Sequence, residues 1–197
     1  MGQSRGTDKL HCAGMAGATW NDTGLYRLAV KVGRQLQRTR RRLTTAESCT
    51  AGWIAKALTD VPGSSQWFET GYVTYSNESK QRELDVPART LMRHGAVSGE
   101  TVRAMARGAL YRARADLAVA VSGIAGPDGG TPTKPVGTVW FGTAVRRGRV
   151  VHAECRHFGG DRERVRRRAV EYALRLVLRE LRIRGAARAR AARTARP

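Results

Sequence analysis

The stretch TTAESCTAG, residues 44–52, joins two segments with different hydrophobic periods. Residues 43–46 are apolar or β-branched, which is typical of a strand. From residue 53 the apolar side chains fall on one face of a helix, at Trp53, Ile54, Ala57 and Leu58. The segment therefore predicts a strand, a tight turn and a helix over 49–60, with Ser48 where the strand passes into the helix N-terminus.

Ser48 has two interpretations at such a place. Free backbone N–H groups and the helix dipole favour negative charge there, so the hydroxyl can act as a nucleophile beside an oxyanion site. The same serine can instead be an N-cap, which stabilises a helix by about 1 kcal/mol and does no chemistry. The stretch taken alone favours the N-cap.

Helices and strands alternate along the rest of the chain. Helices are expected over 23–38, from Ser76, over 87–93, after Ser98 and after Asp161. Strands are expected over 68–75 and 117–121, and over 137–145 and 149–157 as a hairpin. The order predicts an α/β domain over 23–183, with a mixed sheet covered by helices on both faces. Residues 1–22 and the Arg-rich tail 184–197 have no core pattern, and we expect them to be disordered.

Length and composition exclude several protein classes. The 197 residues, 41% of them hydrophobic, fit one globular domain. No apolar run reaches the roughly 20 residues that a membrane span needs, and the first residues lack the apolar core of a signal peptide. We therefore expect a cytoplasmic protein without membrane contact. Cys12, Cys49 and Cys155 are an odd number without CxxC spacing, which indicates reduced thiols.

The formal charge of +20 suggests nucleic-acid binding. The arginines gather in three places, at 38–42, at 162–168 and along 182–196. No aromatic RNA-binding motif and no recognisable groove-reading module accompany them. The sequence therefore predicts non-specific nucleic-acid binding at most.

Three expected strands end in residues that can carry chemistry. Ser48 follows the first strand, Tyr75 and Lys80 follow the second, and the glycine-rich loop 122–130 follows the third. Sites in α/β sheets gather beyond the carboxyl ends of strands, so we expect these segments to converge. Glycines permit close approach of a ligand, but they suit any loop, and this one is neither a Walker A nor a Rossmann motif.

Five stretches taken together resemble the CinA carboxy-terminal domain family, whose stand-alone members are nicotinamide mononucleotide deamidases. They are TTAESCTAGWIAKALTDVPGSSQWF, GYVTYSNESK, HGAVSGETVRAMARGAL, ADLAVAVSGIAGPDGGTPTKPVGTVWF and FGGDRERVRRRAVEYAL. The resemblance covers about residues 24–182. It implies a single three-layer α/β/α domain without metal or cofactor, which hydrolyses the amide of nicotinamide mononucleotide to the acid and ammonia. We also expect a homo-oligomer.

The resemblance assigns catalysis to Ser48, Tyr75 and Lys80. An amide is a poor electrophile and a hydroxyl a weak nucleophile, so a base is needed. A lysine can serve when burial or neighbouring positive charge lowers its pKa. Tyr75 can relay the proton or hold the lysine, and the N–H groups of Cys49 and Thr50 can bind the oxyanion. Taken singly, Tyr75 fits a sheet-edge aromatic and Lys80 a solvated surface lysine. Cys49, next to the serine, is interpreted as a small packing residue, because the family motif places the chemistry on the serine.

The substrate phosphate is expected at the glycine loop, whose backbone N–H groups can cradle an anion. Either Arg162 or Arg164, near the start of the last helix, can add positive charge there. The expected substrate contacts are Thr50, Gly52, Asn77, Gly123, Ala125, Gly126, Arg162 and Arg164.

One position departs from the family pattern, because Ala51 stands where the family usually has a glycine. A glycine there would matter if the backbone needed a positive φ or close approach to substrate. We favour the alternative that residue 51 lies in the first helical turn, where alanine is harmless.

Two other functions stay open at this point. The chain can be a non-catalytic pyridine-nucleotide-binding member of the family, or a nucleic-acid-associated protein linked to competence or DNA damage. The presence of Ser48, Tyr75 and Lys80 together favours the enzyme.

Overall fold

A five-stranded mixed sheet forms the centre of the molecule, in the order β2-β1-β3-β4-β5. The computed structural model describes residues 23–146 and 151–194, with side-chain environments as far as residue 183. β1 pairs in parallel with β2 and β3, whereas β4 is antiparallel to both β3 and β5. The strands are β1 Leu43–Glu47, β2 Phe68–Val73, β3 Leu117–Gly123, β4 Thr138–Val145 and β5 Val151–His157.

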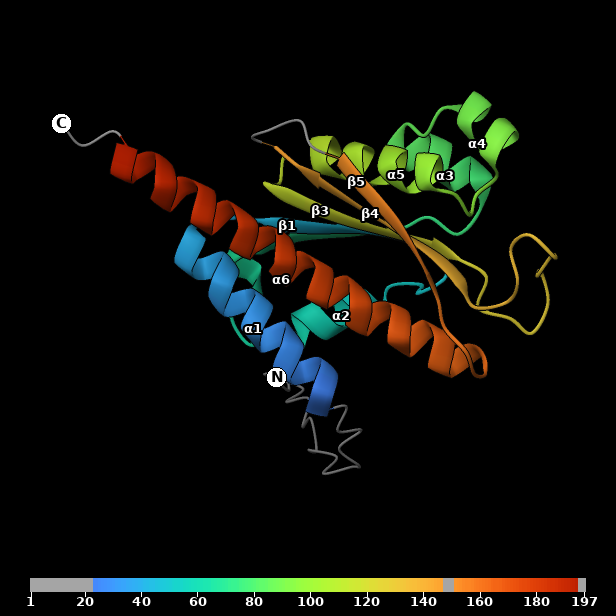
Figure 1. Cartoon of the computed structure of the whole chain (residues 1–197), viewed down its shortest axis with the longest axis horizontal. Coiled ribbons are helices and arrows are strands. Elements are labelled where there is room, and N and C mark those ends of the chain that lie inside the picture. Colours follow the sequence, from blue (N-terminus) through green and yellow to red (C-terminus); the bar gives the residue numbers. More distant parts are fainter. Residues whose placement is uncertain (1–22, 147–150, 195–197) are drawn as a thin grey trace, which may run out of the picture.

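Helices cover both faces of the sheet, which gives three layers (Figure 1). One face carries α1, α2 and α6, with α1 and α6 side by side, and the other carries α3, α4 and α5. The helices are α1 Thr23–Thr39, α2 Trp53–Thr59, α3 Asn77–Leu84, α4 Ala88–His94, α5 Gly99–Arg112 and α6 Arg162–Thr194, and a short 3-10 turn, η1, spans Ser64–Gln66. The predicted α/β class and three-layer architecture are confirmed.

β3 is buried on both faces, as its continuous apolar run predicts. Val119 and Val121 belong to the core beneath α1, α2 and α6, whereas Ala118 and Ala120 belong to the core beneath α3–α5. The alternation follows from the two-residue period of a strand. Small alanines on one side allow α5 to lie close to the sheet.

Most predicted elements are present within a few residues of their expected bounds, including the hairpin of β4 and β5. Two elements close to Ser48 are shorter than predicted. β2 ends at Val73 and not at residue 75, and α2 begins at Trp53 and not at residue 49. The expected disordered tail from residue 184 also differs, since α6 continues to Thr194. Alanine and arginine are strong helix formers, so RGAARARAAR extends a helix that is already packed.

Residues 1–22, where we expect disorder, lie outside the described residues. Across the part of the chain that the structure describes, no helix is long and apolar enough to cross a membrane.

Gly142 offers a test of the packing between β4 and α5. A Cβ at this position would lie 2.4 Å from the backbone oxygen of Val102, and backbone cannot move aside as a side chain does. We expect Gly142→Ala to lower the free energy of unfolding by about 1–3 kcal/mol, the usual cost of overpacking. Denaturant titration followed by circular dichroism measures it.

Gly24 of α1 is the matched control, because a Cβ there meets nothing within 4 Å. Gly24→Ala should stabilise the protein by up to about 1 kcal/mol, since glycine is a poor helix former. Equal effects of the two substitutions would contradict the packing described for β4 and α5.

Candidate active site

The three segments expected to converge lie at one edge of the sheet, at the carboxyl ends of β1, β2 and β3. The Ser48 N–H donates to the carbonyl of Val121 at 3.0 Å, and the Thr74 N–H donates to the carbonyl of Glu47 at 2.8 Å. These bonds continue the parallel ladders by one residue on each side of β1. They place Ser48 between the end of β2 and the end of β3.

The segment after Ser48 is a turn and not the beginning of a helix. α2 starts at Trp53 and its N-cap is Gly52, with φ of 89°. Ser48 is therefore not an N-cap, and the prediction that it lies at a helix N-terminus is wrong. Ala51 has φ of 51°, in the left-handed region, so the expectation that alanine sits harmlessly in a helical turn is also wrong.

Glu47 gives the turn its shape, a role that the sequence analysis missed. Its carboxylate is fully buried and accepts hydrogen bonds from the N–H groups of Ile54 and Ala55, at 3.0 and 2.8 Å. It also accepts from the hydroxyls of Thr50, at 2.8 Å, and Thr45, at 3.3 Å. A buried charge is tolerated where donors satisfy it, and here they include the first N–H groups of α2. The acidic residue thus caps α2 from the far side of the turn.

Lys80 reaches Ser48 from α3. Its Nζ lies 3.1 Å from the Ser48 Oγ, and the residue is 1% exposed. The same amine donates to the carbonyls of Thr74 at 2.9 Å and Tyr75 at 3.1 Å, and lies 3.4 Å from the carbonyl of Ser76. Lys80 is therefore a buried partner of the serine and not a solvated surface lysine.

Burial lowers the pKa of Lys80 from its ordinary value of 10.5. Electrostatic interactions with Cys49 and Glu78 raise the pKa, by less than burial lowers it. A neutral amine has two N–H donors and one lone pair. In the structure the amine donates to the Ser48 Oγ and to the carbonyls of Thr74, Tyr75 and Ser76. In its neutral form it can keep the two shorter carbonyl bonds, to Thr74 and Tyr75, and accept from the Ser48 hydroxyl through its lone pair. Burial shifts Lys80 toward this neutral form, which a general base requires.

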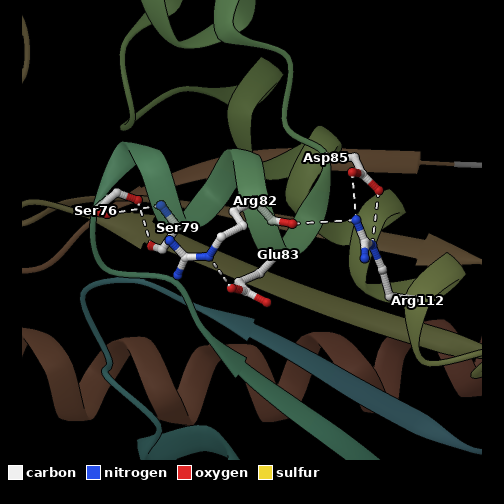
Figure 2. Close-up of polar contacts among 6 residues, drawn as sticks. All are labelled: Ser76, Ser79, Arg82, Glu83, Asp85 and Arg112. Carbon is white, nitrogen blue, oxygen red and sulfur yellow. Dashed lines mark hydrogen bonds and ion pairs between the residues drawn. The ribbon is translucent and has the colours of Figure 1, made fainter.

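Helix α3, which carries Lys80, has polar contacts at both ends (Figure 2). At its start the Ser76 hydroxyl accepts from the Ser79 N–H at 3.0 Å. At its end Arg112 of α5 binds both carboxylate oxygens of Asp85, at 2.7 and 3.1 Å, and its Nη2 lies 3.5 Å from the Arg82 carbonyl. Bidentate pairing fixes the orientation of the two partners, so α3 is held against α5.

Tyr75 contacts the site in a different way from the one expected. Its backbone carbonyl, and not its hydroxyl, binds Lys80, and the residue is 60% exposed. The hydroxyl accepts from Arg162 Nη2 at 3.1 Å, and Arg162 Nη1 donates to the carbonyl of Gly126 at 2.7 Å. Arg162 thus joins the end of β2 to the glycine loop. Arg164 pairs with Asp161 instead, with Nε 3.5 Å from the carboxylate.

The other expected contacts lie around the same sheet edge. Asn77 begins α3, and Gly123 ends β3, where a Cβ would come within 2.7 Å of Val139. Ala125 is buried, and Gly126 has φ of 84°, a conformation that favours glycine.

Cys49, next to the serine, is a poor alternative nucleophile. Burial raises the pKa of its thiol to about 12, and the thiolate is the reactive form. Cys49 and Cys155 are both free thiols, as expected, and Cys12 lies outside the described residues.

Arg166 is a second residue that the sequence analysis did not single out. Its Nε donates to the carbonyl of Cys49 at 3.0 Å and its Nη2 to the carbonyl of Thr50 at 3.1 Å. The guanidinium also lies 5.5 Å from the centre of the Trp53 ring. The sequence pattern could not identify Arg166, because it is one of several arginines at 162–168 and no local feature distinguishes it from the others.

Two surface hollows lie elsewhere on the molecule. One, of about 550 Å³, is lined by α4 and α5, and another, of about 730 Å³, by α5, β4 and β5. Neither hollow is lined by Ser48 or Lys80. We therefore define the candidate active site by the contacts of these two side chains and not by a hollow. In the described ranges, no group of three or more His, Cys, Asp and Glu residues is placed to hold a metal ion.

The fold and the site define a class: α/β/α domains with a serine and a buried lysine at the carboxyl ends of parallel strands. The model of the CinA C-terminal domain matches residues 25–181, and the chain belongs to that family. It is 56% identical over 154 residues to the nicotinamide-nucleotide amidohydrolase PncC of Escherichia coli K12, covering 78% of this chain and 92% of the relative. It is 58% identical over 147 residues to the protein of the same name from Pseudomonas putida, covering 75% and 91%.

Solved structures agree with this assignment. The competence/damage inducible protein CihA of Agrobacterium tumefaciens matches with a TM-score of 0.77 at 42% identity, covering 81% of this chain and 96% of that one. The competence damage-inducible protein A of Klebsiella pneumoniae matches with a TM-score of 0.77 at 43% identity, covering 80% and 96%. The similarity to named amidohydrolases supports an amidohydrolase.

The positive φ of Ala51 leads to a prediction on stability. Left-handed backbone costs a non-glycine residue roughly 1–2 kcal/mol, and glycine's greater freedom in the unfolded chain offsets part of the gain. Ala51→Gly should therefore raise the free energy of unfolding by about 0.5–1 kcal/mol, measured by denaturant titration. The control Ala104→Gly, inside α5, should lower it by about 1 kcal/mol. A loss of stability in both variants would rule out strain at residue 51.

Proposed function

We propose that this chain hydrolyses the carboxamide of nicotinamide mononucleotide, giving nicotinic acid mononucleotide and ammonia. The observation that carries the proposal is the 3.1 Å contact between the Ser48 hydroxyl and the buried amine of Lys80. The names of the relatives from E. coli and P. putida support the choice of substrate.

In the first half of the reaction Ser48 forms an ester with the nicotinoyl group. The Oγ attacks the amide carbon while neutral Lys80 takes the hydroxyl proton. The tetrahedral intermediate then collapses, the C–N bond breaks, and the Lys80 ammonium gives its proton to the leaving nitrogen, which departs as ammonia. Lys80 is neutral again at the end of this half.

In the second half a water molecule hydrolyses the ester. Lys80 takes a proton from the water as its oxygen attacks the acyl carbon, and returns it to the Ser48 Oγ as the C–O bond breaks. The product is the carboxylic acid, and the enzyme regains its starting state. One residue thus serves as base and acid in turn.

The remaining expected residues bind and orient the substrate. The N–H groups of Cys49 and Thr50 hold the oxyanion of the tetrahedral intermediate. The phosphate lies at the loop 123–126 beside the charge of Arg162. Arg162 donates to the Gly126 carbonyl and the Tyr75 hydroxyl, and among the described residues its other N–H groups have no acceptor, so they can bind the phosphate. Tyr75 orients Arg162 through its hydroxyl. We also propose that the protein works in the cytoplasm as a homo-oligomer.

An ammonia-release assay with purified protein tests the proposal. Nicotinamide mononucleotide should be deamidated, and free nicotinamide, which lacks the ribose phosphate, much more slowly. Ser48→Ala should abolish turnover and still bind the nucleotide in calorimetry, because it removes the nucleophile alone. Cys49→Ala is the matched control and should keep most of the activity.

Three results would contradict the proposal. They are equal rates on nicotinamide and its mononucleotide, near wild-type turnover by Ser48→Ala, and loss of turnover in Cys49→Ala but not in Ser48→Ala.

The lowered pKa of Lys80 predicts the pH dependence of the reaction. A general base acts in its neutral form, so kcat/KM should rise with pH through an apparent pKa below 10.5. Lys80→Ala should lose about 10²–10⁴-fold in kcat, and Lys80→Arg should not restore it, because a guanidinium stays protonated. A rate profile between pH 6 and 10.5 measures this. A rise centred on the ordinary lysine value, or full activity in Lys80→Arg, would exclude Lys80 as the base.

A further inference from the structure

Arg166 makes a set of contacts that the reaction described above does not use. It extends from the first turns of α6 to the turn that follows Ser48, and it is half-buried there. Two of its N–H groups bind consecutive backbone carbonyls, those of Cys49 and Thr50. The Trp53 ring under the guanidinium, 5.5 Å away, limits the orientations of its plane.

Each of these carbonyls shares a peptide unit with the N–H of the following residue. The Cys49 carbonyl shares its unit with the Thr50 N–H, and the Thr50 carbonyl with the Ala51 N–H. In a trans peptide the C=O and the N–H point in opposite directions within one plane. A carbonyl held on Arg166 therefore directs the N–H of its own unit away from α6. For the unit between Thr50 and Ala51, that N–H donates to the Ser48 carbonyl at 3.1 Å, which closes the turn.

The peptide unit between Cys49 and Thr50 is held in the same way, through its carbonyl. Thr50 is fully buried, so the two contacts of Arg166 act on the shape of the turn and not directly on a substrate. Through the Ala51 N–H that shape fixes the backbone of Ser48, whose hydroxyl lies 3.1 Å from the Lys80 amine.

We propose that Arg166 is a positioning residue that fixes the turn after Ser48 and so holds the Ser48 hydroxyl against the Lys80 amine. This inference rests on the proposed function, in which Ser48 attacks an amide carbonyl. Arg166 does not touch the substrate, and acts only through the two carbonyls of the turn. Its effect is therefore expected on the chemical step and not on nucleotide affinity.

Steady-state kinetics of Arg166→Met, with nicotinamide mononucleotide as substrate, tests the inference. A general base typically contributes about 10²–10⁴-fold in rate, and here its contact with the serine is misaligned and not removed. We expect kcat to fall about 30- to 100-fold while KM stays within threefold. Arg166→Lys, which keeps the charge but not the two-pronged geometry, should restore only part of the rate. A kcat within threefold of wild type, or a loss confined to KM, would overturn the inference.

Arg175→Met is the matched control, because Arg175 is on the same helix and binds only Glu171 in the described structure. It should leave kcat and KM unchanged. Thermal melts accompany each variant. If Arg166→Met does not fold, the folded Arg166→Lys decides the matter, and wild-type kcat in that variant would overturn the inference.

A fluorophosphonate probe separates this inference from the proposed function. The probe modifies an activated serine, and its phosphoryl oxygen occupies the oxyanion position. If wild type is labelled at Ser48 but releases no ammonia from nicotinamide mononucleotide, the proposed substrate is wrong and the role of Arg166 is still tested. Labelling should then be about 30- to 100-fold slower in Arg166→Met than in Arg175→Met, and equal rates would overturn the inference.

Discussion

The burial of the Lys80 amine against the Ser48 hydroxyl is the interaction on which the site depends. Burial lowers the pKa of Lys80, and two backbone carbonyls at the end of β2 hold the nitrogen in place. A lysine loses solvation when it is buried, so the surrounding structure must be rigid enough to keep it there. The cap at Ser76 and the pairing of Asp85 with Arg112 provide that rigidity at the two ends of α3.

The turn after Ser48 is held by charge from both sides. The buried carboxylate of Glu47 binds N–H groups at the start of α2, and the guanidinium of Arg166 binds carbonyls within the turn. Ionised groups make stronger hydrogen bonds than neutral ones, so these contacts fix a conformation that includes a left-handed alanine at position 51. The oxyanion donors that we propose are thus part of a turn with little freedom.

Much of the fold and part of the site follow from local pattern. The period of the apolar residues predicts the helices and strands, and parallel strands necessarily bring their carboxyl ends to one edge, where Ser48 and Lys80 meet. The predicted start of α2 is wrong because the pattern cannot show that Glu47, five residues before the N-cap Gly52, satisfies the helix N–H groups. The extension of α6 is missed because RGAARARAAR lacks a core face, although its residues favour helix.

The sequence by itself determined the α/β class, the family and the identity of the serine and lysine, because these depend on periodicity and on motifs that are contiguous in the chain. Only the tertiary structure decided which neighbours surround those two residues. In the structure Arg162, and not Arg164, binds the glycine loop. Tyr75 contacts Lys80 through its backbone carbonyl and not through its hydroxyl. The structure also separated Arg166 from its neighbouring arginines, since side chains adjacent in sequence point to different parts of the fold when a helix packs on a sheet.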